Sequence, residues 1–317
     1  AIKITLYRVA KHSNIVNSLI NAVKNGKEVT VVMELQARFD EESNLYWTNK
    51  LQEAGANVIF GVPDFKIHAK CCVIFRRENN KTVHYAHLST GNYNGRTARL
   101  YSDTALFTAD PRITKDVIKV FSFIKNFPKI QYKFSHLLVA PYYMKMEYLK
   151  LIDAEIRQAN KGKPAFIYAK MNSLVDEQMI DKLYEASNAG VKIRLIVRGI
   201  CCLVPGVKGQ SENIEAISIV DKFLEHSRFF IFHHSGTDKL YLSSADWMSR
   251  NLDKRIETAY PVYDPDLKKE LMDLFMIQWN DNVKARIIGK EQLNTMKPHG
   301  LPSIRSQFET YDYLRLK

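Results

Sequence analysis

Two short segments of this 317-residue chain each place a cation two residues after a histidine. One reads Lys-Ile-His68-Ala-Lys70 and the other reads Glu-His226-Ser-Arg228. On a strand, side chains two positions apart share a face, so His68 should point with Lys70 and His226 with Arg228. An imidazole can attack or protonate a phosphate group while a fixed cation holds the phosphate oxygens. The repetition therefore predicts two half-sites that act on one charged substrate.

The two histidines suit phosphoryl transfer because they can take different roles. A neutral imidazole is a good phosphorus nucleophile, and the phosphoramidate it forms passes its phosphoryl group on. We interpret His68 as this acceptor and His226 as the group that protonates the departing oxygen. The alternative is that both are ordinary core or surface histidines, which leaves the repeated cations unexplained. Asn92 and Asp246 occupy equivalent repeat positions, where they either orient the imidazoles or the substrate, or simply form turns.

The histidine segments belong to a longer internal repeat. Blocks of similar sequence recur in the same order and pair residues 21–33 with 185–197, 88–94 with 242–248, and 104–111 with 258–265. The first block reads as a helix end, a glycine stop and a buried strand. Because the period exceeds a hundred residues, the repeat indicates a duplicated domain and not a solenoid.

Each half alternates strand-like and helix-like segments, which predicts an α/β fold. We expect amphipathic helices at residues 113–124 and 144–159 and divide the chain into domains at 1–130 and 131–317. A helix precedes the first strand of the second half, whereas nothing precedes the equivalent strand at residues 2–6. We therefore expect the chain to be cut from a longer protein, with an equivalent helix upstream of Ala1.

The composition indicates a polyanionic partner. Lys and Arg total 46 against 34 Asp and Glu, which gives a formal net charge of +12 spread through both halves. The alternative is a merely basic surface. The four cysteines occur as two adjacent pairs without zinc spacing, so we expect reduced core residues of a cytoplasmic protein. A peripheral position at the inner face of the membrane stays open.

Several arginines are expected at or just beyond strand ends, where ligands collect in α/β sheets. They are Arg8, Arg38, Arg99, Arg198 and Arg255. The planar guanidinium suits phosphate oxygens, so several of them are candidates to line a phosphate site. Each alone could equally be a solvated surface charge. The sequence contains no P-loop motif, so any use of ATP would be of another kind.

The spacing of His68 and Lys70, followed by the segment at 89–94, resembles the His-Lys motif of the phospholipase D superfamily. That motif has an aspartate where this chain has Phe75, and the second copy has Arg228 for lysine. More specifically, the chain resembles the C-terminal half of family-1 polyphosphate kinases. The segments that carry this resemblance span nearly the whole chain, at residues 6–10, 34–40, 66–70, 90–94, 97–101, 197–199, 225–228 and 242–248.

The resemblance implies reversible transfer of the γ-phosphate of ATP to polyphosphate through a phosphohistidine. Carried over by position, His68 matches the phosphorylated histidine and His226 the second catalytic histidine. Tyr101 and Arg198 match positions that contact the nucleotide. The resemblance also implies that the enzyme is a phosphoprotein. Its substrates would be ATP or ADP and inorganic polyphosphate, and no nucleic acid partner is expected.

Arg8 and Arg38 match positions that the family associates with Mg²⁺. A guanidinium cannot ligate a cation, so we interpret both as holding the phosphates that carry the metal. The family also has an N-terminal domain and a head domain, and it forms homo-oligomers. We expect the chain without those domains to be impaired as an enzyme.

We therefore predict two tandem phospholipase D-like α/β domains, related by internal duplication, with the active site at their interface. Around the two histidines, the predicted substrate- and nucleotide-binding residues are Lys70, Asn92, Arg99, Tyr101, Arg198, Arg228, Asp246 and Arg255. Two alternatives stay open. One is a phosphodiesterase of the same superfamily that acts on nucleic acid or phospholipid, and the other is an inactive module that binds polyanions.

Overall fold

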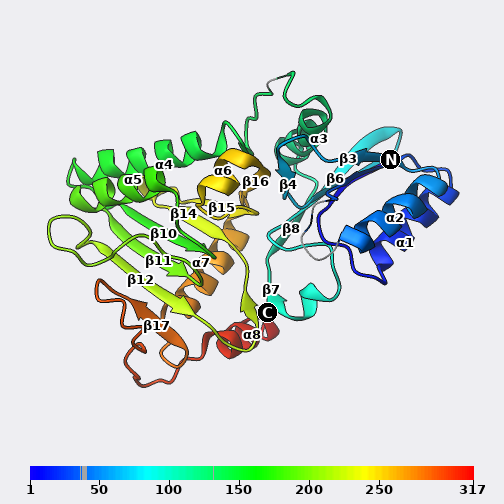
Figure 1. Ribbon diagram of the computed structural model, residues 1–317. Helices are drawn as coiled ribbons and strands as arrows, with labels where there is room; N and C mark the ends of the chain where they lie inside the picture. The colour runs from blue at the N-terminus through cyan, green and yellow to red at the C-terminus, as the bar shows by residue number, and fades with distance from the viewer. Residues whose placement is uncertain (36, 38–40, 131) are drawn as a thin grey trace. The chain divides into compact units, whose positions relative to one another are not determined.

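A computed structural model describes residues 1–35, 37, 41–130 and 132–317. These residues form two compact units (Figure 1). The first unit contains Ala1–Met144 together with two short later segments, Ser243–Ala245 and Arg250–Tyr260. The second unit contains the remaining residues up to Lys317. The predicted domain boundary between residues 130 and 131 stays a prediction.

The first unit is built on a six-stranded mixed sheet. Its strands, in spatial order, are β3 (Asn57–Phe60), β2 (Val29–Met33), β1 (Ile2–Leu6), β5 (Cys71–Glu78), β6 (Lys81–Ser89) and β8 (Ala105–Thr108). The strands β3, β2 and β1 run parallel to one another, and β5, β6 and β8 each run antiparallel to their neighbours. The parallel part places the ends of β1 and β2 at one edge, which is where the loops with Arg8 and Glu34 begin.

Helices cover parts of this sheet. Helices α1 (Asn14–Lys24) and α2 (Glu41–Glu53) bury Val16, Leu19 and Trp47 against β1 and β2. Helix α3 (Pro111–Asn126) packs against β5 and β6. The short elements η1 (Thr97–Arg99) and β7 (Tyr101–Ser102) lie in the connection before β8.

A second group of strands in the first unit positions His68. Strand β16 (Arg255–Pro261) pairs in parallel with the short strand β4 (Lys66–Ile67) and antiparallel with β9 (Leu138–Ala140). The short helix α6 (Ser249–Lys254) leads directly into β16. A segment from the second half of the sequence thus forms part of the surroundings of His68.

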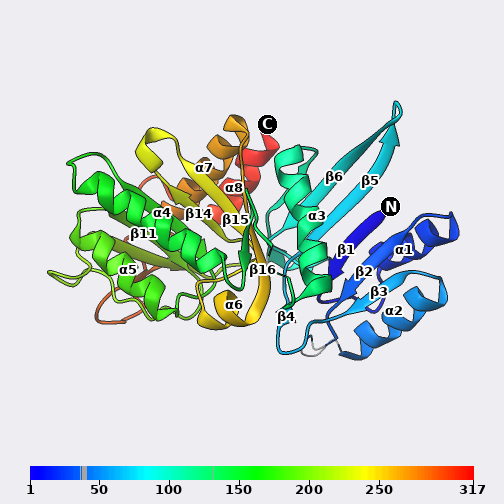
Figure 2. The same ribbon diagram turned by 90° about the horizontal axis from the view of Figure 1, so that it is seen from above.

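The second unit has a mixed sheet of its own. The strands, in spatial order, are β17 (Ala285–Ile288), β12 (Ile214–Ile219), β11 (Lys192–Val197), β10 (Phe166–Met171), β14 (Phe229–Phe232) and β15 (Lys239–Ser243). The other elements of this unit are α4 (Met144–Ala159), α5 (Glu177–Asn188), β13 (Leu224–Glu225), η2 (His234–Gly236), α7 (Pro265–Trp279) and α8 (Ser306–Arg315). Helices α4 and α5 lie side by side on the same face of the sheet (Figure 2).

The strand order confirms the internal repeat. The order β12-β11-β10-β14-β15 in the second unit matches β3-β2-β1-β5-β6 in the first, with the same parallel and antiparallel pairings. The predicted glycine stops also match. Gly26 (φ 70°) follows α1 and Gly190 (φ 93°) follows α5, and both helix ends are closed by a backbone hydrogen bond of 3.0 Å to the carbonyl five residues back, from Lys27 and from Val191.

The histidine segments are turns and not strands, which corrects the prediction that each histidine shares a strand face with its cation. Strand β4 ends at Ile67, before His68, and β5 begins only at Cys71. The N–H groups of His68 and Ala69 both donate to the carbonyl of Ile256, at 2.9 Å each. Successive N–H groups of a regular strand point in opposite directions, so the chain bends here. Likewise, β13 ends before His226 and β14 begins after Arg228.

The predicted helices at 113–124 and 144–159 are confirmed as α3 and α4. All four cysteines are free, as expected, and Cys71 is buried. Cys202 is exposed in the loop after β11, so the predicted core placement is wrong for this residue. Among the described residues, no helix combines the length and apolar character needed to cross a membrane.

The left-handed backbone at Gly190 gives a test of the repeated helix end. Gly190→Ala should lower the free energy of unfolding by about 1–2 kcal/mol, because a Cβ disfavours positive φ. A matched control is Gly61→Ala, since Gly61 has neither a positive φ nor atoms within 4 Å of an added Cβ. Chemical denaturation should show the control within about 0.5 kcal/mol of the parent. Equal stabilities for the two variants would contradict this account.

Candidate functional site

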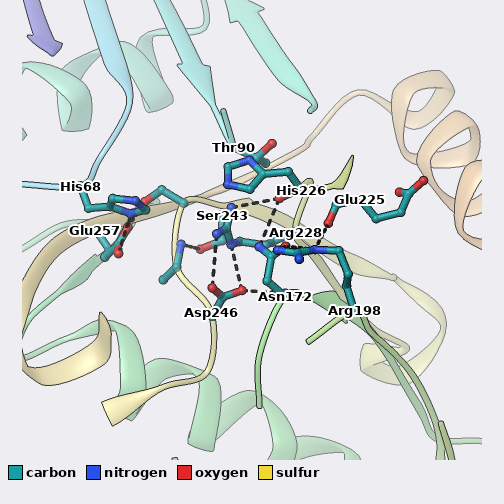
Figure 3. Close-up of polar contacts among 12 residues, drawn as sticks. His68, Thr90, Asn172, Arg198, Glu225, His226, Arg228, Ser243, Asp246 and Glu257 are labelled. Atoms are coloured by element: carbon teal, nitrogen blue, oxygen red, sulfur yellow. Dashed lines mark hydrogen bonds and ion pairs between the residues drawn. The ribbon is translucent and has the colours of Figure 1, made fainter. Parts of the chain in front are cut away.

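His68 lies directly against a buried carboxylate. Its Nδ1 is 2.9 Å from Oε2 of Glu257 and also 2.9 Å from Oε1 (Figure 3). A carboxylate only accepts hydrogen bonds, so the imidazole donates from Nδ1. The proton on Nδ1 leaves Nε2 as the ring nitrogen with an available lone pair. His68 itself is about nine-tenths buried, at 9% exposure.

Glu257 is held in place by a hydroxyl as well as by the imidazole. The Ser244 hydroxyl donates to Oε2 of Glu257 at 2.5 Å, and Oγ of Ser244 itself accepts the N–H of Thr258 at 3.1 Å. The guanidinium of Arg255 approaches Oε1 of Glu257 at 3.7 Å. Glu257 is fully buried, and a buried carboxylate is tolerated only when such partners compensate its lost hydration. These contacts therefore fix the orientation of the carboxylate that orients His68.

The backbone before His68 is anchored by a second buried carboxylate. Oε2 of Glu34 accepts the N–H of Ile67 at 2.8 Å. The ring of Tyr7 meets the His68 imidazole edge to face, with 4.8 Å between centroids and an interplanar angle of 83°. Burial raises the pKa of the Tyr7 hydroxyl, although the nearby Arg255 and Arg8 oppose this shift. The His68 ring is thus confined on two sides.

Lys70 is almost fully buried, at 1% exposure. Its ammonium donates to the carbonyl of His68 at 2.6 Å and lies 5.4 Å from the centroid of the Tyr7 ring. In this position Lys70 stabilises the turn that presents His68. It adds positive charge next to the imidazole in a region of low dielectric, where charge acts strongly.

A basic cavity of about 520 Å³ adjoins this group through Tyr7. Five cationic side chains line the cavity together with Tyr7 and Asp64, and they are Arg8, Lys66, Arg250, Lys254 and Arg255. A wall with five cations and one carboxylate is a favourable surface for a chain of phosphate groups. We name it the basic cavity.

The second unit holds a different polar cluster around the turn at 226–228. Arg228 binds Asp246 with two parallel hydrogen bonds, from Nε to Oδ1 at 3.0 Å and from Nη2 to Oδ2 at 3.2 Å (Figure 3). Oδ1 of Asp246 also accepts the N–H of Asn172 at 2.7 Å. Burial alone raises the pKa of the Asp246 carboxyl, but Arg228, Asn172 and His226 outweigh it and hold the pKa below its ordinary value.

Arg228 also fixes the backbone at the second histidine. Its Nη1 donates to the carbonyl of His226 at 3.0 Å. Arg198 binds the same turn one residue earlier, since its Nε donates to the carbonyl of Glu225 at 2.9 Å and to Oδ1 of Asn172 at 2.9 Å. Four predicted site residues of the second half therefore lie together, and they are Arg198, His226, Arg228 and Asp246. His226 is close enough to Asp246 to help lower the pKa of its carboxyl.

Glu225, which precedes His226, is buried and accepts hydrogen bonds from three side chains. Its carboxylate accepts from Lys170 at 2.6 Å, from Gln278 at 3.3 Å and from Gln307 of helix α8 at 2.7 Å. Lys170 also donates to the hydroxyl of Ser227 at 2.8 Å. Side chains on both sides of His226 therefore lock the turn, with the C-terminal helix among the contributors.

The remaining predicted residues are more dispersed. Tyr101 lies in β7 and is half-buried, and Arg99 is exposed beside a separate cavity of about 690 Å³. Oδ1 of Asn92 is buried and has no hydrogen-bond partner among the described residues. Arg38 lies outside the described residues. The structure therefore groups Arg8 and Arg255 with the basic cavity and leaves Arg99 outside it.

Sequence reasoning missed Glu257, Arg250 and Lys254. A signal for Glu257 was present in the repeat, because the block that starts at Thr104 is preceded by Asp103 and the matching block at Thr258 is preceded by Glu257. For Arg250 and Lys254, the signal was a pair of cations four apart before a strand. Both lie on α6 or at its end and face the basic cavity.

The described residues contain no group of three or more His, Cys, Asp or Glu side chains arranged to hold a metal ion. The basic cavity is a poor direct metal site because cationic side chains dominate it. A divalent ion would fit there only together with the phosphate oxygens of a substrate.

The comparisons first define the class of protein. The chain aligns over 99% of its length with 88% of a crystal structure of phosphatidylserine synthase from Haemophilus influenzae, with a TM-score of 0.63 at 9% identity. At this identity the likeness concerns the fold alone. The protein has a mixed α/β fold, as predicted, and it shares this fold with the synthase.

The family follows from the sequence. Residues 1–130 match the family described as polyphosphate kinase C-terminal domain 1, and residues 137–307 match polyphosphate kinase C-terminal domain 2. The chain is 54% identical to polyphosphate kinase of Vibrio parahaemolyticus and 52% identical to that of Escherichia coli, over 99% of its own length. The chain belongs to the polyphosphate kinase family.

A solved structure supports the same assignment. The crystal structure of polyphosphate kinase from Porphyromonas gingivalis matches 99% of the chain with a TM-score of 0.90 at 43% identity. The chain covers 48% of that protein, 45% of the Vibrio parahaemolyticus relative and 46% of the Escherichia coli relative. It therefore spans a little under half the length of these relatives.

The lowered pKa of Asp246 predicts how stability depends on pH. Asp246→Asn should remove stability that is fully present above the ordinary aspartate pKa of about 3.9 and that fades as pH falls through the lower folded pKa. The difference in unfolding free energy between the parent and this variant should therefore be larger at pH 6 than at pH 3.

The matched control for this measurement is Asp181→Asn, on the exposed side of α5. Denaturant titrations at both pH values should place it within about 0.5 kcal/mol of the parent. An Asp246→Asn difference that is the same at both pH values, or larger at pH 3, would contradict the assigned role of Arg228.

Proposed function

We propose that this chain carries the catalytic groups of a polyphosphate kinase, which transfers the γ-phosphate of ATP reversibly to inorganic polyphosphate through phosphohistidine 68. The observation that carries the proposal is the His68 imidazole, held at Nδ1 by buried Glu257 next to the basic cavity. Family membership and the names of the relatives support the activity. The proposal extends the activity of these relatives to this chain.

The first step is attack by Nε2 of His68 on the γ-phosphorus of ATP. A nitrogen–phosphorus bond forms, the bond from phosphorus to the bridging oxygen breaks, and ADP leaves with the electron pair. Glu257 stabilises the positive charge that develops on the imidazole and keeps Nε2 oriented. In the second step, a terminal oxygen of polyphosphate attacks the phosphorus and His68 departs. Both steps run in reverse when ADP accepts the phosphoryl group.

His226 is proposed as the group that donates a proton to the departing oxygen. Arg228 and Asp246 then act on it indirectly, because Arg228 binds the His226 carbonyl and Asp246 binds Arg228. In this proposal both residues position His226, whereas the sequence interpretation made them candidates for substrate binding, which stays a prediction. The shared active site of the two halves stays a prediction.

We assign the binding of the substrate phosphates to cationic side chains. Arg8 and Arg255 of the basic cavity are proposed to hold phosphate oxygens, with Arg38 as a further candidate. Tyr101, Arg198, Arg99, Lys70 and Asn92 stay candidates for nucleotide or substrate binding. Mg²⁺ would arrive with ATP and neutralise phosphate charge during transfer. A cytoplasmic or peripheral membrane location and a homo-oligomeric assembly are further proposals.

Labelled ATP tests the proposed mechanism in the intact protein. With γ-labelled ATP, the parent should become labelled by an acid-labile, base-stable bond, and α-labelled ATP should give no label. His68→Ala should abolish both the label and polyphosphate synthesis. His226→Ala should keep the acceptor but slow transfer by about 10²–10⁴-fold, which is the usual contribution of a general acid.

His299→Ala provides the control, because His299 is exposed and its Nδ1 lies 3.0 Å from the backbone carbonyl oxygen of Asn282. This variant should match the parent. A label that persists in His68→Ala would reassign the nucleophile. Labelling of the protein by α-labelled ATP would favour the alternative of a phosphodiesterase. A complete lack of labelling in the parent would favour the alternative of an inactive module that binds polyanions.

A further inference from the structure

The second unit contains a cavity that is lined by none of the candidate site residues. Its volume is about 430 Å³, and residues of β12, of β17 and of the end of α7 line it (Figure 1). Most of the wall is apolar and includes Pro205, Ile214, Ile217, Trp279, Ile287 and Pro298. The charged side chains in the wall are Glu215, Lys290 and Lys297. An apolar cavity of this volume with a few polar groups has the composition of a small-molecule site, and we name it the apolar cavity.

The cavity lies where helix α7 stops covering one face of the sheet. On this face Tyr168, Arg194 and Glu215 pair directly across β10, β11 and β12. The ring of Phe275 in α7 stacks on Tyr168, with 5.2 Å between centroids. Helix α7 ends at Trp279, whose ring centroid lies 5.3 Å from Cζ of Arg194. Glu215 is next in the row and is exposed, so the cover ends beyond Arg194.

Gly289 leaves the space beside Glu215 unfilled. Strand β17 pairs antiparallel with β12, with Ile287 opposite Ile217, and the register continued one residue past β17 sets Gly289 beside Glu215. Gly289 has no left-handed φ, and among the described residues a Cβ added there would meet only Cγ2 of Ile287, at 3.9 Å. The backbone therefore does not require glycine at this position, and a larger side chain would fit. Ile287, in the wall of the cavity, is 40% exposed as a result of the open space.

Lys297 places a positive charge in the wall of the apolar cavity. Its ammonium donates to the carbonyl of Trp279 and lies 5.5 Å from the centroid of the Trp279 ring. Burial lowers the pKa of Lys297, although the nearby Asp281 and Glu215 oppose this shift. Asp281 is already engaged, because its Oδ1 accepts the backbone N–H groups of residues 283–285. The ammonium has therefore lost hydration that the protein does not fully replace.

We propose that the apolar cavity binds a small aromatic carboxylate, whose ring packs on Trp279, Ile217 and Ile287 and whose carboxylate reaches Lys297. A flat ring suits this wall, because the indole and the two isoleucines offer apolar surface that a ring covers well. A carboxylate supplies the charge-assisted hydrogen bond that the ammonium lacks. A neutral ligand would bury the ammonium further without a partner. The proposal does not depend on the proposed function.

The charges of the wall separate this site from a void left by loose packing. Such a void would lack an ammonium in its wall, because a partly buried charge without an anionic partner costs free energy. Lys290, which is exposed, adds a second cation, and Glu215 is a carboxylate at the exposed side. Cations thus outnumber carboxylates in the wall, and this excess favours a ligand with one negative charge.

Calorimetric titration of the intact protein with 1-naphthoate tests the site, and 1-naphthamide serves as a neutral probe of the same shape. The parent should bind the acid at least about tenfold more tightly than the amide. Gly289→Leu should weaken binding of the acid at least about tenfold, because the added side chain occupies the cavity. Gly61→Leu is the matched control, since Gly61 also has no positive φ and no atom within 4 Å of an added Cβ. This control should bind the acid as the parent does.

Lys297→Gln gives an independent measurement, because it removes the charge and keeps a donor for the Trp279 carbonyl. This variant should bind the acid and the amide equally, whereas Lys192→Gln, at an exposed lysine of β11, should keep the preference for the acid. Equal affinities of the parent and Gly289→Leu for 1-naphthoate would overturn the proposal. So would a preference for the acid that survives in Lys297→Gln, or a parent that does not bind 1-naphthoate.

Discussion

The carboxylate of Glu257 contacts the imidazole of His68 across 189 residues of sequence, and the surroundings of His68 depend on this contact. Strand β16 brings the carboxylate there by pairing in parallel with β4, with Ile256 opposite Ile67. The carbonyl of Ile256 then accepts two successive N–H groups, from His68 and Ala69, and this bends the chain out of the strand. The bend directs the imidazole toward the carboxylate that follows Ile256.

The buried carboxylates of Glu257 and Asp246 have different hydrogen-bonding partners, and the difference suits different roles. Glu257 is satisfied by a hydroxyl and an imidazole, so one of its partners is a group that can react. Asp246 is satisfied by the arginine Arg228, which stays charged at every accessible pH. Removal of one partner from a buried pair is costly because the other charge is left unpaired. The second-unit pair is thus a rigid support, whereas the first keeps an imidazole in a defined orientation.

The sequence was sufficient to predict the repeat and most of the regular structure. The glycine stops at Gly26 and Gly190 and the helix over residues 144–159 follow from local chemistry, and local chemistry is readable in one sequence. The turns at His68 and His226 were mistaken for strands, because their bends arise from hydrogen bonds to distant partners. Residues 66–70 carry no local signal for the Ile256 carbonyl that bends them.

The candidate site was only partly predictable for the same reason. Types and spacing identified the two histidines, and repeated positions suggested Asp246, which the structure joins to Arg228. Glu257 was recognised as a site residue only from the pairing of β16 with β4, which brings its carboxylate to His68. The sequence alone held one indication, because Glu257 matches Asp103 in the repeat. Long-range strand pairing decides which polar groups meet, and periodicity does not report it.

The central claim is that Glu257 occupies Nδ1 of His68 and so reserves Nε2 for chemistry. NMR spectroscopy of the intact protein, labelled with ¹⁵N at histidine and phosphorylated with ATP, measures directly which ring nitrogen of His68 is bonded to phosphorus. We expect phosphorylation at Nε2, with the proton retained at Nδ1. Phosphorylation at Nδ1 would contradict it, because that atom could not then donate to the Glu257 carboxylate.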